Sequence, residues 1–237
     1  MEKARPYTGI AAIALAIGFN VPYAVLAATY DYPDILRRPA GEALDLFAAG
    51  GASLVFTWHA FAISALLMAP MAFALALTPR SIAQRPALAV GAAIAGALAG
   101  VTQAMGLWRW VFVVPGLARV HADPTADEAS KRAAEQTFEL INQYGGVAIG
   151  EHLGQLLTAL FVLFLSALQW AEAKRISAVI GFITAGAIVL GTNEGLAIAV
   201  GQSGETFALA TIVGFLGLAV WLIATGIGLI RPGPQQA

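Results

Sequence analysis

The chain has 237 residues, of which 59% are hydrophobic and only 11% charged, and its formal net charge is -1. A soluble domain has about 25% charged residues, so this composition excludes an ordinary soluble fold. The near-neutral charge without basic tracts argues against a nucleic-acid partner. Because there is no cysteine, disulfides, iron–sulfur clusters and thiolate metal sites are excluded as well. The composition predicts an all-α integral membrane protein.

Six apolar stretches are long enough to cross the ~30 Å hydrocarbon core, which takes about 20 helical residues. We therefore predict an integral membrane bundle of six transmembrane helices that forms a single domain over residues 1–237. The predicted spans are residues 8–29, 52–77, 87–114, 146–170, 176–200 and 207–230.

The connector of residues 30–51 is polar, but its second half has an amphipathic pattern. Over residues 41–49, Leu44 and Phe47 fall on one face of a short helix. Such a helix would lie on the bilayer surface. An ordered loop explains the same residues, and the two alternatives remain open.

The most polar segment, residues 116–144, precedes the fourth span. Asp123 is a good N-cap and Pro124 suits the first helical position, which predicts a short amphipathic external helix from Pro124 to about residue 144. The pair Gly145-Gly146 predicts a bend between this helix and the span.

The distribution of basic residues orients the chain. The side that holds the termini has its cations in very short segments, whereas the cations on the other side are spread over long polar ones. By the positive-inside rule both termini are expected in the cytoplasm. The cations of the first group are Lys3, Arg5, Arg80, Arg85, Lys174, Arg175 and Arg231.

Four different spans place strongly polar residues at one depth. At 1.5 Å per helical residue, His59, Arg109, Glu151, His152 and Glu194 each lie roughly 10 Å below the same, non-cytoplasmic interface. Ionisable residues inside a membrane are costly and mark functional sites. We therefore predict a shared polar cluster near the periplasmic face, in which Arg109 pairs with Glu151 or Glu194.

This cluster has three functional interpretations. One is a metal site for iron, zinc or manganese formed by His59, Glu151, His152 and Glu194, although no HExxH spacing supports it. A second is a haem b held by His59 and His152. The third is a cavity for a small polar molecule or a lipid headgroup, with Glu151 and His152 available for acid–base chemistry. The ligand-binding residues would then be Arg109, as an anion anchor, with Gln103, Gln155 and Asn193.

A non-catalytic interpretation stays beside these. The same residues would form an ion-pair network that only fixes helix register, in a structural or accessory membrane subunit. Besides the bilayer, the partners left open are a homo-oligomer and a larger membrane complex.

Other residues have simpler interpretations. His121 is expected to be a solvated surface histidine. An aromatic belt at the membrane interface accounts for several large side chains. These are Trp58, Trp108, Trp110, Trp170 and Tyr144. The glycines 146, 150 and 154 follow one another at a spacing of four residues, which predicts a close approach between helices.

Several stretches resemble a bacterial integral-membrane family labelled only as a domain of unknown function. They are YPDILRRP, LFAAGG, FTWHAFAISALL, GLWRWVFVVPGLAR and NQYGGVAIGEHLGQLLTAL. The resemblance covers about residues 8–230. It implies a multi-span protein of the bacterial inner membrane, and it implies no activity.

Overall fold

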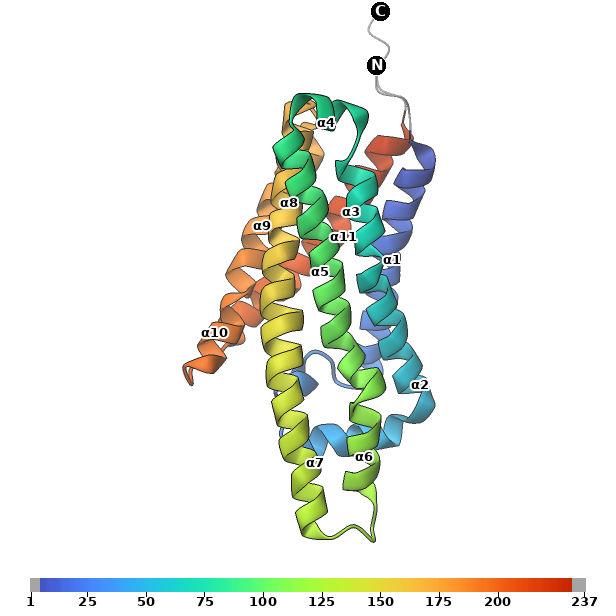
Figure 1. Ribbon diagram of the computed structural model, residues 1–237, viewed down its shortest axis with the longest axis vertical. Coiled ribbons are helices and arrows are strands. Elements are labelled where there is room, and N and C mark those ends of the chain that lie inside the picture. The colour runs from blue at the N-terminus through green and yellow to red at the C-terminus, as the bar shows by residue number, and fades with distance from the viewer. Residues whose placement is uncertain (1–4, 232–237) are drawn as a thin grey trace, which may run out of the picture.

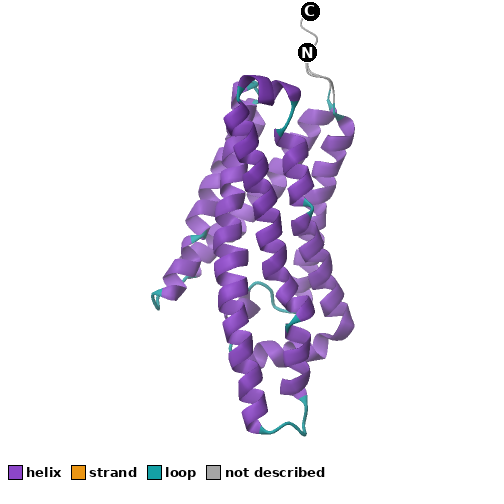
Figure 2. Ribbon diagram, in the orientation of Figure 1, coloured by secondary structure: helices purple, strands orange, loops and turns teal. Residues whose placement is uncertain are grey.

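The computed structural model describes residues 5–231, and this part of the chain consists of helices joined by short loops, with no strand (Figures 1 and 2). Lys3 and the rest of residues 1–4 and 232–237 lie outside the described residues. The helices are α1 (Pro6–Thr29), the 3-10 helix η1 (Asp34–Arg37), α2 (Ala40–Leu66), α3 (Met68–Ala76), α4 (Pro79–Gln84), α5 (Pro86–Phe112), α6 (Val114–Ala122), α7 (Glu128–Ile141), the π-helix η2 (Asn142–Leu153), α8 (Gly154–Ala171), α9 (Arg175–Gly191), α10 (Asn193–Ala199) and α11 (Glu205–Ile230).

Six helical segments of the described chain are long and apolar enough to cross a membrane, which confirms the predicted fold class. These segments are Pro6–Thr29, Ala40–Ala76, Pro86–Ala122, Glu128–Ala171, Arg175–Ala199 and Glu205–Ile230. The third and fourth have 37 and 44 residues. At 1.5 Å per residue they are about 55 and 66 Å long, well above the ~30 Å hydrocarbon core. Their adjoining ends, α6 and α7, therefore extend beyond the bilayer at one end of the molecule (Figure 1).

The amphipathic segment of the first connector is a helix, and it is continuous with the second span. The helix α2 bends at Gly51, whose φ of 57° and ψ of -152° are accessible to glycine at little cost. The part before Gly51 crosses the end of the bundle (Figure 1). Leu44 is fully buried and Phe47 is 3% exposed, so the apolar face of this helix packs against protein.

The face with Leu44 and Phe47 covers a core of aromatic rings. Trp58 and Trp110 stack with their ring centroids 4.9 Å apart, and Tyr30 lies edge-on to both. Both tryptophans are fully buried, so their predicted place in an interfacial belt is wrong. The cause is the external layer of α6, α7 and the first part of α2, which covers side chains that would otherwise reach the interface. Trp170 and Tyr144, in contrast, are 46% and 65% exposed.

The external helix begins later than predicted. Its N-cap is Asp127, whose carboxylate accepts a hydrogen bond from the Ser130 N–H at 2.7 Å. Asp123 instead accepts hydrogen bonds from the backbone N–H and the hydroxyl group of Thr125. Asp123 thus stabilises a turn before the helix, a role that short polar side chains share with N-capping.

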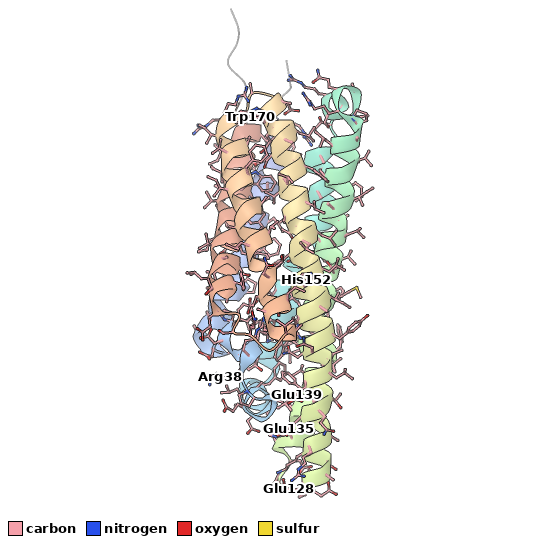
Figure 3. The ribbon with its side chains drawn as sticks, turned by 90° about the vertical axis from the view of Figure 1, so that its left-hand side faces the viewer. Arg38, Glu128, Glu135, Glu139, His152 and Trp170 are labelled. Carbon is pink, nitrogen blue, oxygen red and sulfur yellow. The ribbon has the colours of Figure 1, made fainter. Side chains whose placement is uncertain are left out.

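The predicted bend at Gly145-Gly146 is also wrong. The chain passes through these glycines as the π-helix η2 and continues into α8, so that α7, η2 and α8 form one continuous helical segment (Figure 3). Gly146, Gly150 and Gly154 instead pack closely against α5. A Cβ atom on Gly150 would lie 3.0 Å from the Gly106 Cα atom, and one on Gly154 would lie 2.8 Å from the Gln103 Cγ atom. The close approach predicted from the glycine spacing is therefore confirmed.

His121 is not a solvated histidine. Its side chain is 13% exposed, because α6 continues through Pro115 to Ala122 and packs between α2 and α7. Its Nδ1 atom lies 2.8 Å from Asp45 Oδ1 on α2, and its Nε2 atom lies 2.9 Å from Glu135 Oε1 on α7. The imidazole ring therefore joins three helices of the external layer, outside the membrane-spanning part of the chain.

This arrangement predicts a pH-dependent stability. Burial lowers the pKa of His121, but the hydrogen bonds and charges of Asp45 and Glu135 raise it further, so that the pKa lies above its ordinary value near 6.5. The stabilisation is then fully present below about pH 6.5 and is lost as the pH rises through the pKa of the folded state. We expect the free energy of unfolding to fall over that range, and His121→Asn to remove this fall. An unchanged pH profile in His121→Asn would contradict the assignment.

Candidate functional site

A cavity of about 670 Å³ lies between α1, η1, α2, α5, η2, α8, α10 and α11. Its lining combines a group of charged and amide side chains, called the polar end below, with a longer and mostly apolar part. The polar end contains Arg37, Gln103, Arg109, Glu151, Gln155 and Glu194. The apolar part includes Phe19, Phe215, Leu218, Ala219 and Leu222. Leu216 also lines the cavity and is 54% exposed, so the cavity borders the lipid-facing surface of α11.

Arg37 links the two acidic residues at the polar end. Its Nη2 atom lies 2.6 Å from Glu151 Oε2 and 2.9 Å from Glu194 Oε1. The side chains are 31%, 23% and 15% exposed for Arg37, Glu151 and Glu194, so water screens the pairs only in part. Burial lowers the pKa of Arg37, but the two carboxylates raise it above its ordinary value. The three charges thus fix one another, and they join the connector to η2 and α10.

A helix break places Glu194 in this site. The fifth span is interrupted at Thr192, between α9 and α10, and Glu194 lies in the first turn of α10. The His152 Nδ1 atom lies 3.0 Å from the Thr192 carbonyl oxygen. His152 therefore supports the break and does not line the cavity.

Arg109 lies at the same polar end but does not form the predicted pair with Glu151 or Glu194. Its Nη2 atom donates to Asn142 Oδ1 at 2.9 Å, and Nη1 donates to the Gly106 carbonyl oxygen. A Cβ atom on Gly146 would lie 2.6 Å from Nη2, so a larger residue at this position would displace the guanidinium. The prediction was wrong because a cation from the connector, Arg37, occupies the place between the two acids.

Five residues of the cavity lining carry buried polar atoms without a hydrogen-bond partner. Within residues 5–231, the unpartnered atoms on the cavity residues are Trp58 Nε1, Arg109 Nε, Trp110 Nε1, Glu151 Oε1 and Gln155 Oε1. Buried polar groups almost always have a partner, and each one without costs about 1–3 kcal/mol. Three of these atoms are donors and two are acceptors, and all five residues that carry them line this one cavity.

The structure brings some of the predicted ligand-binding residues together and leaves others out. Gln103 and Gln155 line the cavity with Arg109, and the Gln103 Nε2 atom donates to Thr158 Oγ1 at 2.6 Å. Asn193 does not line it, because its amide donates to the carbonyl oxygens of residues 189 and 190.

Neither of the two histidines predicted as metal or haem ligands lines the cavity. His59 accepts a hydrogen bond from Trp108 Nε1 at 3.4 Å and lies outside the cavity lining, as does His152. No group of three or more His, Asp or Glu side chains in the described part of the chain is placed to hold a metal ion. Of the predicted metal ligands, the cavity is lined only by Glu151 and Glu194. Glu151 is likewise the only one of the two acid–base candidates that faces it.

Sequence reasoning missed Arg37, Asn142 and the two tryptophans of the cavity lining. Arg37 belongs to the polar connector of residues 30–51, for which the sequence predicts a position outside the bundle. Its neighbour Arg38 is a surface residue that pairs with Asp31. The signal that could have identified Arg37 is the charge imbalance within the predicted spans. The spans contain two acids, Glu151 and Glu194, but only one cation, Arg109, so a second cation from outside the spans is needed.

The sequence matches the model of a protein family described as a domain of unknown function, DUF4386, over residues 7–226. No curated protein and no solved structure matches the chain. The match confirms the resemblance drawn from the sequence over about residues 8–230, and it agrees with the six apolar helices of the structure. The chain therefore belongs to the DUF4386 family.

Proposed function

We propose that this protein binds an amphipathic molecule whose polar headgroup carries no net charge. The headgroup would lie at the polar end of the cavity, against Arg109, Glu151 and the two tryptophans Trp58 and Trp110. The apolar part of the molecule would lie along α11, from Phe215 to Leu222. We place the protein in the bacterial cytoplasmic membrane with both termini in the cytoplasm.

The observation that carries this proposal is the set of unpartnered polar atoms around the cavity. A headgroup that accepts from the Trp58, Trp110 and Arg109 N–H groups and donates to Glu151 and Gln155 would satisfy all five residues. Because an unsatisfied buried donor or acceptor costs free energy, a molecule of this chemistry is favoured over an apolar one.

The charge balance of the site argues for a neutral or zwitterionic headgroup. Arg37 and Arg109 contribute two positive charges at the polar end, and Glu151 and Glu194 contribute two negative charges. The other acids of the lining, Asp34 and Glu205, are exposed and therefore screened by water. A ligand with a net charge would bring an uncompensated charge into a medium of low dielectric, which is costly.

The shape of the cavity argues for an apolar chain on the ligand. Along α11 the lining runs from Glu205 to Leu222, which is about 26 Å at 1.5 Å per residue. Leu216 gives this part of the cavity a boundary with the bilayer, from which an amphipathic molecule could enter sideways.

A purely structural role accounts for the ion pairs but not for the unpartnered polar atoms of the cavity residues. Arg37, Glu151 and Glu194 fix the positions of η1, η2 and α10 without any ligand. An ion-pair network of that kind has no need of the unpartnered indole N–H groups of Trp58 and Trp110 nearby. We therefore regard the ion pairs as the support of the site.

The test is a series of single-chain probes that share a brominated chain and differ only in headgroup. Bromine quenches tryptophan fluorescence on contact, and Trp58 and Trp110 line the cavity. The protein carries Trp108→Phe and Trp170→Phe, which removes the tryptophans outside the cavity that have exposed surface. The probes carry a zwitterionic phosphoethanolamine group, which both accepts and donates hydrogen bonds, an anionic sulfate group or a cationic ammonium group.

We expect saturable quenching by the zwitterionic probe, and binding of both charged probes that is at least about tenfold weaker, equivalent to 1.4 kcal/mol. The tightest binding by the anionic probe would contradict the proposal and favour Arg109 as an anion anchor. Quenching without saturation by all three probes would contradict any binding in this cavity.

A further inference from the structure

A second cavity, of about 600 Å³, lies at the end of the bundle where α1 begins and α11 ends. It is formed by Arg5, which immediately precedes α1, by the ends of α3, α8 and α11 and by the starts of α4 and α9. It has no lining residue in common with the first cavity. Trp170, which Figure 3 labels near this end of the molecule, lies on α8 next to the lining residues.

The charge of this lining is strongly positive. Among the described lining residues the one acid is Glu172, and its carboxylate pairs with Lys174 Nζ at 2.7 Å. The guanidinium groups of Arg5, Arg175 and Arg231 then give the lining three further positive charges. No acidic side chain of the described residues forms an ion pair with any of these three arginines.

Two of these arginines are held in place. The Arg5 side chain donates to the Ala74 carbonyl oxygen, and its backbone N–H donates to the Leu229 carbonyl oxygen at 2.9 Å. The Arg175 guanidinium lies over the Trp170 ring, with 3.9 Å from Cζ to the ring centroid. Both contacts restrict the side chain without neutralising its charge.

The uncharged part of this lining is mostly apolar. It includes Leu75, Leu165, Leu168, Ala224 and Leu229. The buried polar groups among these residues are already satisfied, since Gln169 donates to Thr225 Oγ1 at 3.0 Å and accepts from Trp221 Nε1 at 3.2 Å. A bound molecule therefore meets unneutralised charge from the arginines and hydrocarbon from the rest of the lining, unlike the ligand of the first cavity.

We propose that this cavity binds an anionic phospholipid, whose phosphate group lies between Arg5, Arg175 and Arg231 and whose acyl chain follows the apolar lining. Guanidinium groups match phosphate oxygens in geometry as well as in charge. Basic pockets between membrane helices bind anionic lipid headgroups for the same reason. The apolar lining favours a lipid over a soluble phosphate, which would leave those residues without a partner.

The experiment is native mass spectrometry of the protein in dodecyl maltoside, titrated with phosphatidylglycerol and phosphatidylcholine of identical acyl chains. The test variant is Arg175→Gln/Arg231→Gln. The matched control is Arg80→Gln/Arg85→Gln, which removes two charges at the same end from residues that do not line the cavity. Arg231→Gln alone is included because Arg231 is exposed at the end of α11, where a substitution does not disturb packing.

We expect the wild-type chain and the control to bind phosphatidylglycerol at least about tenfold more tightly than phosphatidylcholine. Two arginines of the lining should account for roughly 10- to 30-fold in phosphatidylglycerol affinity, and Arg231 alone for about fivefold. Equal affinity for the two lipids in the wild-type chain would overturn the proposal, as would an equal loss in the control. Displacement of the lipid by millimolar inorganic phosphate would show a site for soluble phosphate and overturn it too.

Discussion

Replacing Arg37 with methionine is expected to destabilise the folded chain by about 2–3 kcal/mol. Removing one partner from a fully buried ion pair costs about 3–5 kcal/mol, because the remaining charge is left unpaired. Arg37 holds two carboxylates, but its side chain is 31% exposed, so water reduces the cost to the lower end of this range or slightly below it. The measurement is equilibrium unfolding in mixed micelles of increasing sodium dodecyl sulfate content, followed by circular dichroism.

Two further variants make this prediction specific. Adding Glu151→Gln and Glu194→Gln to Arg37→Met removes the two carboxylates that lose their partner and should recover most of the lost stability. Arg38→Met is the matched control, because Arg38 is 43% exposed and pairs with the exposed Asp31, so its loss should cost below about 1 kcal/mol. If Arg38→Met and Arg37→Met were equally destabilising, Arg37 would have no special role in the structure.

Replacing Gly106 with alanine is expected to lower the free energy of unfolding by about 3 kcal/mol. The new Cβ atom would lie 2.6 Å from the Gly150 Cα atom and 3.0 Å from the Gly145 carbonyl oxygen. Overpacking costs about 1–3 kcal/mol, and the upper end applies because both obstacles are backbone atoms that no rotamer change can move. The separation of α5 from η2 would also displace Arg109, so binding in the first cavity should weaken together with stability.

The control for this variant is Gly116→Ala on α6. A Cβ atom on Gly116 would meet no atom within 4 Å. Alanine is favoured over glycine inside a helix by roughly 0.5–1 kcal/mol, so this variant should be neutral or slightly stabilising. Both variants are measured by the same unfolding assay. A neutral Gly106→Ala would show that α5 and η2 do not need their close contact.

The six spans could be predicted because their cause is local. A bilayer of fixed thickness requires about 20 apolar residues in a row, and each of the six stretches meets this requirement by itself. The close packing of Gly150 against α5 was predictable for a similar reason, since small residues four apart share one face of a helix. The exact ends of the helices were not, as Asp123 and Asp127 are equally good caps by residue type.

The candidate site was predicted only in part, because its remaining parts depend on how distant segments meet. At 1.5 Å per helical residue, Glu151, Glu194 and Arg109 are expected at the same depth in the membrane, and all three line one cavity. Arg37 lies 114 residues from Glu151 along the chain, in a connector whose return into the bundle has no local signal. Trp58 and Trp110 sit where an interfacial belt is expected, and only the external layer that covers them makes them buried.

The π-helix η2 is a further feature that the sequence did not indicate. It contains both Gly146, which makes room for Arg109, and Glu151, which contacts Arg37. π-helical turns are rare and occur frequently at functional sites. Here the twelve residues of η2 bring an acidic residue and a gap for a guanidinium to the same cavity.

The central claim is that the first cavity binds an amphipathic molecule without net charge. Its most direct test is to fill the cavity with a larger side chain and to measure the affinity for the zwitterionic brominated probe. Ala208 lines the cavity, and Ala210, half a turn further along α11, does not. We expect Ala208→Phe to weaken probe binding at least about tenfold and Ala210→Phe to leave it unchanged. Equal binding by both variants would show that the probe lies elsewhere and would contradict the claim.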